Sequence, residues 1–228
     1  MALTEAQIDR FSRQIILPQI GGAGQERLLR SSVAVAGAGD LADLVALSLG
    51  GAGIGRIALH GAERGRLSRE LVDLDPEAEV TVSTGALGSA AADVLVACDV
   101  AVDALDCAAA SGWPLVAGGA HGQGGWMIVS EGHDVCASCA ARAAGRAGID
   151  ARSVVDDQAL HPDAPRPSPL ASSTTGVIAS LMALAVLKLR LGVDGPRRRV
   201  WWRFDGGHST LTEEALERSA DCPVCAET

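Results

Sequence analysis

The chain has 228 residues, of which 48% are hydrophobic, 21% charged and 3% aromatic, and its mean hydropathy is +0.22. This profile excludes a disordered or collagen-like chain and predicts one folded domain with a sizeable core. The formal net charge of -9 repels phosphate backbones and anionic membranes, so we expect neither nucleic acid nor a membrane as a partner. Because no uninterrupted apolar stretch has the length of a membrane span and the N-terminus lacks a signal peptide, we expect a cytoplasmic protein.

The N-terminal half alternates strand and helix patterns, which is typical of a doubly wound, mainly parallel sheet. Residues 3–29 predict two short helices, broken at Pro18, that form an N-terminal arm. Helices are then predicted over 41–49 and about 67–74. Strands are predicted at 32–36, 56–60, 79–83, 100–104, 115–118 and 125–130.

The C-terminal half is less regular. Residues 146–169 are interpreted as a crossing loop, and residues 172–175 as the cap of a helix over 177–191 that ends at Gly192. That helix is apolar nearly all round, so we expect it to be buried, within the chain or between subunits. Residues 200–204 and 209–212 predict antiparallel strands.

These elements predict a single α/β domain over residues 1–228. The fold class is Rossmann-like, with a doubly wound, mainly parallel sheet, antiparallel C-terminal strands and a structural zinc site. The expected parts are the arm (1–30), a half of nucleotide-binding type (31–130), and a half (131–228) with the loop, the buried helix and the zinc-tied end.

Four of the six cysteines form two C-x-x-C pairs. The pairs are Cys136 with Cys139 and Cys222 with Cys225. Two residues between thiolates allow both sulfurs to face one tetrahedral ion, so the four predict a closed structural zinc site without an open position for water. A reducing compartment disfavours disulfides. A redox pair or incidental cysteines are the alternatives.

A glycine turn, Gly37-Ala-Gly39, follows the first predicted strand and precedes a helix. In this arrangement backbone N–H groups and a helix N-terminus face a phosphate. The chain has His60 where a dinucleotide enzyme has an acid, and Asp40 places a carboxylate in the turn, which repels phosphate unless a cation lies between them. A turn retained only for packing is the alternative.

Two acids, Asp103 and Asp106, follow the strand predicted at 100–104, at the edge where ligands bind in such sheets. Magnesium takes one or two carboxylates and otherwise water and phosphate oxygens, so Asp106 is a candidate to hold Mg²⁺ against a triphosphate. A loop acid that caps a turn is the alternative. Cys98 and Cys107 flank apolar segments and are interpreted as buried small hydrophobes rather than nucleophiles.

Together with three further motifs, these features resemble the ThiF/MoeB/HesA family of ubiquitin-activating-type adenylyltransferases, from about residue 8 to 225. The further motifs are Arg10-Phe-Ser-Arg13-Gln-Ile-Ile-Leu, Gly24-Gln-Glu-Arg-Leu and Gly51-Ala-Gly53-Ile-Gly55. The resemblance implies a dimer that binds ATP·Mg²⁺ and adenylates the C-terminal glycine of a ubiquitin-like sulfur carrier. It also implies residue roles: Arg13 for the partner's triphosphate, Asp106 for magnesium, Gly37, Gly39 and Asp40 for the nucleotide, and Cys136, Cys139, Cys222 and Cys225 for zinc.

The sequence departs from the family pattern at several nucleotide contacts. His60 stands at the position of the ribose-binding acid, and no lysine precedes Lys188. The segment that should carry an arginine clamp is shortened to residues 61–66. We therefore expect ATP chemistry that is impaired or lost.

Three hypotheses follow. The first is a ubiquitin-activating-type protein with impaired ATP chemistry, as a homodimer or as the non-catalytic half of a heterodimer that lends Arg13 to an intact paralogue. The second is a non-enzymatic scaffold that binds the carrier. The third is a nicotinamide-dependent enzyme that uses Arg64 or Arg66 on a 2′-phosphate.

Overall fold

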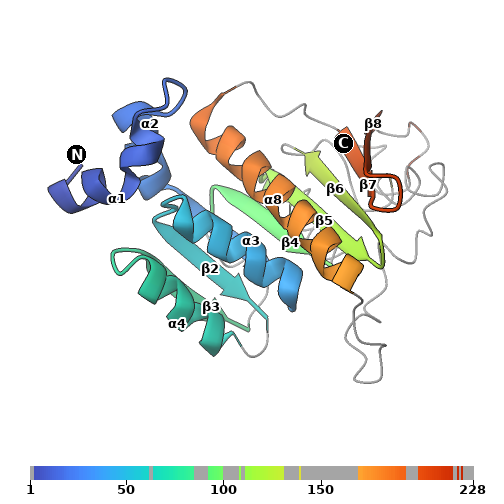
Figure 1. The fold of residues 1–228 in the computed structure, drawn as a ribbon, viewed down its shortest axis with the longest axis horizontal. Helices are drawn as coiled ribbons and strands as arrows, with labels where there is room; N and C mark the ends of the chain where they lie inside the picture. The colour runs from blue at the N-terminus through green and yellow to red at the C-terminus, as the bar shows by residue number, and fades with distance from the viewer. Residues whose placement is uncertain are drawn as a thin grey trace.

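The computed structural model describes residues 3–61, 64–84, 92–99, 111–130, 169–193 and 200–217, together with the single residues 108, 139, 220 and 222. The chain begins with the predicted arm of two helices, α1 (Glu5–Ile15) and α2 (Gly21–Arg30) (Figure 1). A capping box fixes the start of α1, because the Thr4 hydroxyl accepts from the Gln7 N–H and the Gln7 side chain accepts from the Thr4 N–H.

Within the described residues, eight strands form one mixed sheet in the order β3-β2-β1-β4-β5-β6-β7-β8. The strands are β1 (Ser32–Ala36), β2 (Arg56–His60), β3 (Glu79–Ser83), β4 (Val94–Cys98), β5 (Leu115–His121), β6 (Gly124–Ser130), β7 (Val200–Asp205) and β8 (Thr210–Ala215). Pairs from β3 to β5 are parallel, and pairs from β5 to β8 are antiparallel. The predicted mainly parallel sheet with antiparallel C-terminal strands is confirmed.

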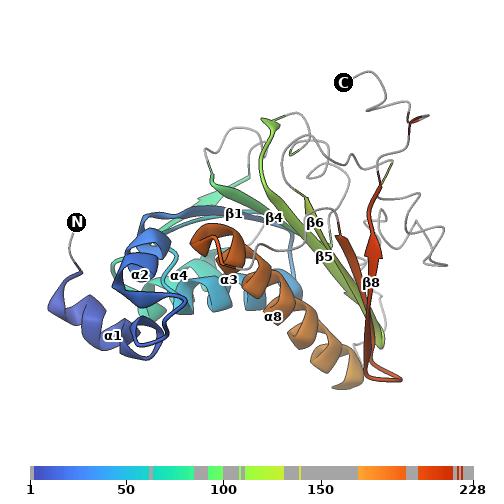
Figure 2. The ribbon, with the colours of Figure 1, turned by 90° about the horizontal axis from the view of Figure 1, so that it is seen from above.

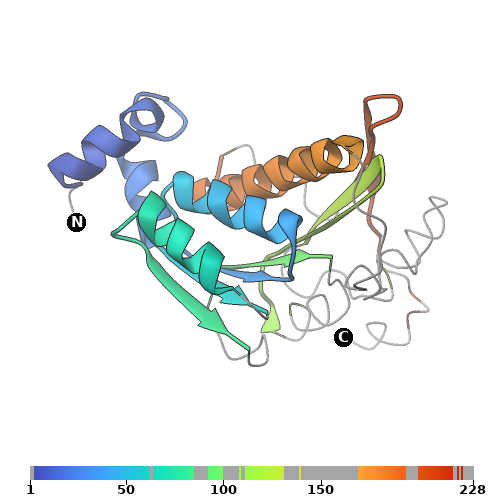
Figure 3. The same ribbon diagram turned by 60° about the horizontal axis from the view of Figure 1, so that its bottom comes forward.

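Three helices, α3 (Asp40–Gly51), α4 (Gly65–Leu74) and α8 (Pro169–Leu191), cover one face of the sheet (Figures 2 and 3). Side chains alternate along a strand, so Val33 and Val35 join the core cluster that these helices share. Ala34 and Ala36 belong to a second cluster on the opposite face, which includes Trp126 and its stacked neighbour Trp201.

One predicted boundary was wrong, and one strand was not predicted. The unpredicted strand is β4 at Val94–Cys98, while the strand expected at 100–104 lies outside the described ranges. Asp99 separates two short apolar runs, and composition favoured the second of them. The expected cap at 172–175 lies inside α8, which begins at Pro169; proline suits the first turn of a helix because its missing N–H has no partner there anyway.

The burial predicted for α8 is confirmed on one side only. Ile178, Met182 and Val186 are buried in the core, whereas Val177 and Leu184 are exposed. Residues 172–191 have the length and composition of a membrane span, yet this helix packs against α3, β5 and β6, as core helices also do. The helix ends as predicted at Gly192, which has a φ of 67° and donates its N–H to the Lys188 carbonyl.

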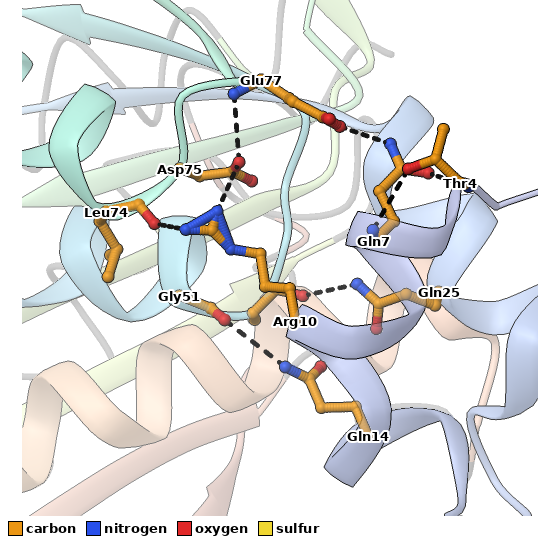
Figure 4. A network of polar contacts seen from close by, with 10 residues as sticks. Thr4, Gln7, Arg10, Gln14, Gln25, Gly51, Leu74, Asp75 and Glu77 are labelled. Carbon is orange, nitrogen blue, oxygen red and sulfur yellow. Dashed lines mark hydrogen bonds and ion pairs between the residues drawn. The ribbon is translucent and has the colours of Figure 1, made fainter.

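Polar contacts connect the N-terminal arm to the rest of the domain (Figure 4). Arg10 forms an ion pair with the buried Asp75 at 3.0 Å and donates to the Leu74 carbonyl. Gln7 donates to Glu77 at 2.7 Å. On α2, the buried Gln25 donates to the carbonyl of Ala52, directly after α3. The arm is therefore fixed to the end of α4 and to the C-terminal end of α3.

A second set of polar contacts lies at the amino edge of the sheet, where β1 and β4 begin. Asp93 accepts from both the N–H and the hydroxyl of Ser32, at 2.8 and 3.1 Å. Arg190 of α8 lies 3.4 Å from the same carboxylate and donates to the Ser31 hydroxyl at 3.0 Å. Four residues, referred to below as the amino-edge cluster, thus tie β1, the residue before β4 and the end of α8 together.

Candidate functional site

The glycine turn lies where the strand order reverses, between β1 and β4. Gly37 and Gly39 have φ values of 122° and 89°, a region that favours glycine. A Cβ on Gly37 would also overlap the carbonyl oxygen of Cys98. Ligands of doubly wound sheets bind outside the carboxyl ends of the strands at this reversal point, so the structure places both predicted glycines at the expected crevice.

The helix that follows the turn carries two carboxylates in its first turn, Asp40 and Asp43, and no side chain caps its N-terminus. Asp40 is exposed. Asp43 accepts from Arg64 at 2.6 Å through one oxygen and from Arg66 at 3.0 Å through the other. The sequence analysis did not single out Asp43, although its place in the first turn of α3 was visible. Its two arginine partners are apparent only in the folded chain, where the start of α4 lies beside the start of α3.

Arg64 lies beside the glycine turn and is buried, with 3% of its side chain exposed. A Cβ on Gly61 would lie 3.0 Å from the Gly37 carbonyl oxygen and 3.5 Å from Nε of Arg64. Apart from the ion pair of Nη1 with Asp43, the guanidinium has no acceptor for Nε or Nη2 among the described residues. A buried cation with spare donors thus faces the turn.

His60, the last residue of β2, is 5% exposed. Neither ring nitrogen has a hydrogen-bond partner within the part of the chain that the structure describes. A neutral imidazole offers one donor and one acceptor, which are the groups that a ribose hydroxyl can pair with. The position predicted to depart from the family pattern therefore still presents polar atoms at the edge of the sheet.

The first acid after β4 is Asp99, which the sequence analysis missed. It has a φ of 55°, and its Oδ1 accepts from the Ala120 N–H at 3.3 Å, so its carboxylate is held at the carboxyl ends of β4 and β5. Asp106 was selected because it followed a strand expected at 100–104. Residues 100–104 and Asp106 all lie outside the described residues.

Cys98 is a buried thiol at this edge. Burial raises its pKa far above the usual range, and the neighbouring Asp99 raises it further, while Arg64 acts in the opposite direction. The thiol therefore stays protonated at neutral pH and is no nucleophile. The interpretation of Cys98 as a small buried hydrophobe is confirmed; Cys107 lies outside the described ranges.

One cysteine of each C-x-x-C pair is described. Cys139 and Cys222 are both buried in the second core cluster, although they lie far apart in the sequence. Cys136 and Cys225 fall outside the described ranges, and within those ranges no group of three potential ligands is close enough to hold a metal. Both described cysteines thus belong to one core cluster, and the zinc site stays a prediction.

Arg13 is exposed on α1 and makes no ion pair or hydrogen bond with the described residues. Its neighbour Gln14 donates to the carbonyl of Gly51, the last residue of α3. The glycine turn precedes the other end of this helix, and twelve residues at 1.5 Å each span about 18 Å. Arg13 is therefore too far from the glycine turn of its own chain to act there.

Residues 11–62, from α1 to the end of β2, match the ThiF family. The predicted family resemblance is confirmed. The chain is 31% identical to the adenylyltransferase and sulfurtransferase MOCS3 of Aedes aegypti, over 99% of this chain but only 57% of that protein. It is 28% identical to the sulfur carrier protein adenylyltransferase of Thermus thermophilus, over 100% of this chain and 94% of the relative.

The fold is also that of Escherichia coli MccB. The crystal structure of MccB with ATP superposes with a TM-score of 0.73 at 16% identity, over 97% of this chain and 74% of MccB. This likeness confirms the Rossmann-like architecture that the sequence predicted.

Proposed function

We propose that the chain is a ubiquitin-activating-type protein that binds a ubiquitin-like sulfur carrier, has impaired ATP chemistry of its own, and lends Arg13 to a partner subunit. The names of its relatives support the carrier as the partner class, since two of them are sulfur carrier protein adenylyltransferases. The observation that carries the proposal is the pairing of Asp43 with both Arg64 and Arg66, which engages the cations nearest the glycine turn.

Adenylation joins the carrier's C-terminal carboxylate to the α-phosphate of ATP and releases pyrophosphate. Catalysis of such a step is mostly positioning and stabilisation of charge on phosphate oxygens. Loss of one such donor costs about 10²–10³ in rate. With Asp40 and Asp43 beside the turn and no lysine before Lys188, a triphosphate meets repulsion that the two arginines only partly offset.

The chain keeps residues that suit each group that the family resemblance implies. The glycine turn and His60 would hold a nucleoside phosphate and its ribose. Asp99, or Asp106 as first predicted, would bind Mg²⁺, a cation that prefers carboxylates, water and phosphate oxygens. The four cysteines would hold Zn²⁺, which would stabilise the end of the chain rather than take part in chemistry.

The position of Arg13 supports action across a subunit interface, in a homodimer or a heterodimer. It is exposed, lacks partners among the described residues and lies at the wrong end of α3 for its own glycine turn. An arginine that stabilises phosphate charge from a neighbouring subunit is worth several powers of ten in rate in other phosphoryl-transfer systems.

ATP–pyrophosphate exchange tests the proposal. The probe is a ubiquitin-like carrier that ends in Gly-Gly, assayed with the chain alone and with an intact paralogue. We expect little exchange alone, exchange in the mixture, and a loss of at least about 100-fold with Arg13→Ala. Arg30→Ala, a second exposed arginine of the arm, is the control and leaves exchange unchanged. Fast exchange by the chain alone would contradict impaired chemistry.

The scaffold is the second candidate, and the exposed side of α8 with Val177 and Leu184 favours it, since a binding protein needs only surface. Carrier binding that persists while the mixture shows no exchange supports the scaffold. Absence of any carrier binding overturns both functions.

A further inference from the structure

The guanidinium of Arg64 presents one unused face to the glycine turn. Its Nη1 is taken by Asp43 at 2.6 Å, while Nε and Nη2 have no acceptor among the described residues. Nε and Nη2 lie on the same side of the planar group, so their N–H bonds form the fork that binds two oxygens of one phosphate or carboxylate. At 3% exposure, these donors are shielded from water.

The surroundings of the fork favour a phosphate. Nε lies near Gly61, whose Cβ would approach the Gly37 carbonyl oxygen, so the fork and the glycine turn border the same space. The N-terminus of α3 begins there without a side-chain cap, and the N–H groups of a helix N-terminus favour a phosphate. His60, whose ring nitrogens have no hydrogen-bond partner in the described part of the chain, ends the neighbouring strand.

The local charge limits how many phosphates fit. Arg64 and Arg66 are outnumbered by carboxylates, namely those of Asp40, Asp43, Glu70 and Asp99. Asp43 is the carboxylate that contacts the Arg64 guanidinium itself. Because like charges repel, each phosphate added beyond the first meets further repulsion from these carboxylates.

We propose that Arg64 forms a binding site for a single phosphate, selecting nucleoside monophosphates or adenylates over triphosphates, with Asp43 as the positioning residue that orients Arg64 and supplies the repulsion. This inference rests on the proposed function, which it deepens by naming the ligand that the impaired site retains. It assigns to the arginine a role that its place in a shortened loop did not reveal.

Calorimetry with adenosine, AMP, ATP and ATP·Mg²⁺ tests the inference on the full-length chain. We expect AMP to bind at least about tenfold more tightly than adenosine, and more tightly than ATP. Arg64→Lys keeps the charge but loses the fork, and should lower the affinity for AMP to the affinity for adenosine. Arg69→Gln is the matched control, because Arg69 is exposed on α4 and its side chain donates to the Gly65 carbonyl; it should leave the AMP affinity within about twofold.

The variant Asp43→Asn distinguishes a role of Asp43 in ligand selectivity from a role in folding stability alone. Removal of this carboxylate should shift the ratio of ATP to AMP affinity toward ATP by at least about tenfold, which a purely structural role would not do. Equal affinities for AMP and adenosine, tighter ATP than AMP in the unaltered chain, or an unchanged ratio in Asp43→Asn would each overturn the inference. Circular dichroism confirms that each variant is folded.

Carrier binding and exchange with the paralogue, measured on the same preparations, keep the two proposals apart. Loss of AMP selectivity with intact carrier binding overturns the phosphate site alone. AMP selectivity in a chain that binds no carrier overturns the proposed function alone.

Discussion

At the residue scale, the two glycines of the turn differ in what surrounds them. A Cβ on Gly37 would overlap the Cys98 carbonyl oxygen, whereas a Cβ on Gly39 meets nothing within 4 Å. Both have a positive φ, so both alanine variants carry backbone strain. We expect Gly37→Ala to lower the free energy of unfolding by about 2–5 kcal/mol and Gly39→Ala by about 1–2 kcal/mol, as urea denaturation measures. Equal losses of unfolding free energy in the two variants would show that β1 and β4 can move apart at little cost to accept the added Cβ.

The buried thiol of Cys98 makes stability depend on alkaline pH. Its folded pKa is raised, so the unfolded chain, whose thiol ionises near about 8.5, gives up the proton first. The stabilisation is complete below that pH and is lost as the pH rises toward the folded pKa, at up to about 1.4 kcal/mol per pH unit. Urea midpoints between pH 8 and 10 should fall more steeply for the unaltered chain than for Cys98→Ala. Identical slopes would contradict the burial effect.

Single residues at the site were predictable where a short stretch of sequence carries the whole motif. The spacing Gly37-x-Gly39 and the departure at His60 were visible in the sequence, and both residues lie at the crevice. The pair of Asp43 and Arg64 was not visible, because it joins residues 21 apart on different elements and no periodicity encodes that pairing. Asp99 was missed because its role depends on where β4 ends.

At the scale of elements, α1 depends on one partly buried ion pair. Asp75 has 4% of its side chain exposed, and Arg10, at 35%, is its guanidinium partner. Because Arg10 is partly solvated, we expect Arg10→Ala to cost about 1–3 kcal/mol rather than the full loss of a buried pair. Urea denaturation and proteolysis near Pro18 should both report a loosened arm. Arg30→Ala, which removes a surface pair, should cost less than about 0.5 kcal/mol.

Element boundaries followed the sequence where glycine or a charged residue bounded an apolar run. The first three strands were predicted at the observed residues, since turn residues flank each of them. The strand β4 was missed because apolar runs lie on both sides of Asp99, and the pairing of the first run with β1 is not visible in the composition. The start of α8 was hidden by a proline-rich stretch in which Pro169 itself is the first helical residue.

At the scale of the whole molecule, the zinc prediction has a direct test. We expect one zinc per chain by elemental analysis and a fall in Tm of more than about 5 °C when a chelator removes it. Cys222→Ser should abolish stoichiometric zinc, because it removes one of the four predicted ligands. Cys98→Ala, at a buried cysteine outside both pairs, should retain it. Apo protein as stable as the metal-loaded form would refute the site.

The architecture as a whole was predictable because the alternation of strands and helices extends along the N-terminal half and needs no long-range information. The balance of charge at the site was not predictable, since it depends on how the start of α4, with Arg64 and Arg66, lies relative to Asp43 of α3.

The amino-edge cluster of Ser31, Ser32, Asp93 and Arg190 shares no residue with the glycine turn at the opposite edge of the sheet. Substitutions that erode the nucleotide edge therefore leave the fastening of the opposite edge untouched. Selection for shape and selection for chemistry act here on separate residues. A change at an exposed acid or arginine of the nucleotide edge can therefore alter ligand affinity while the opposite edge still holds the strands and α8 together.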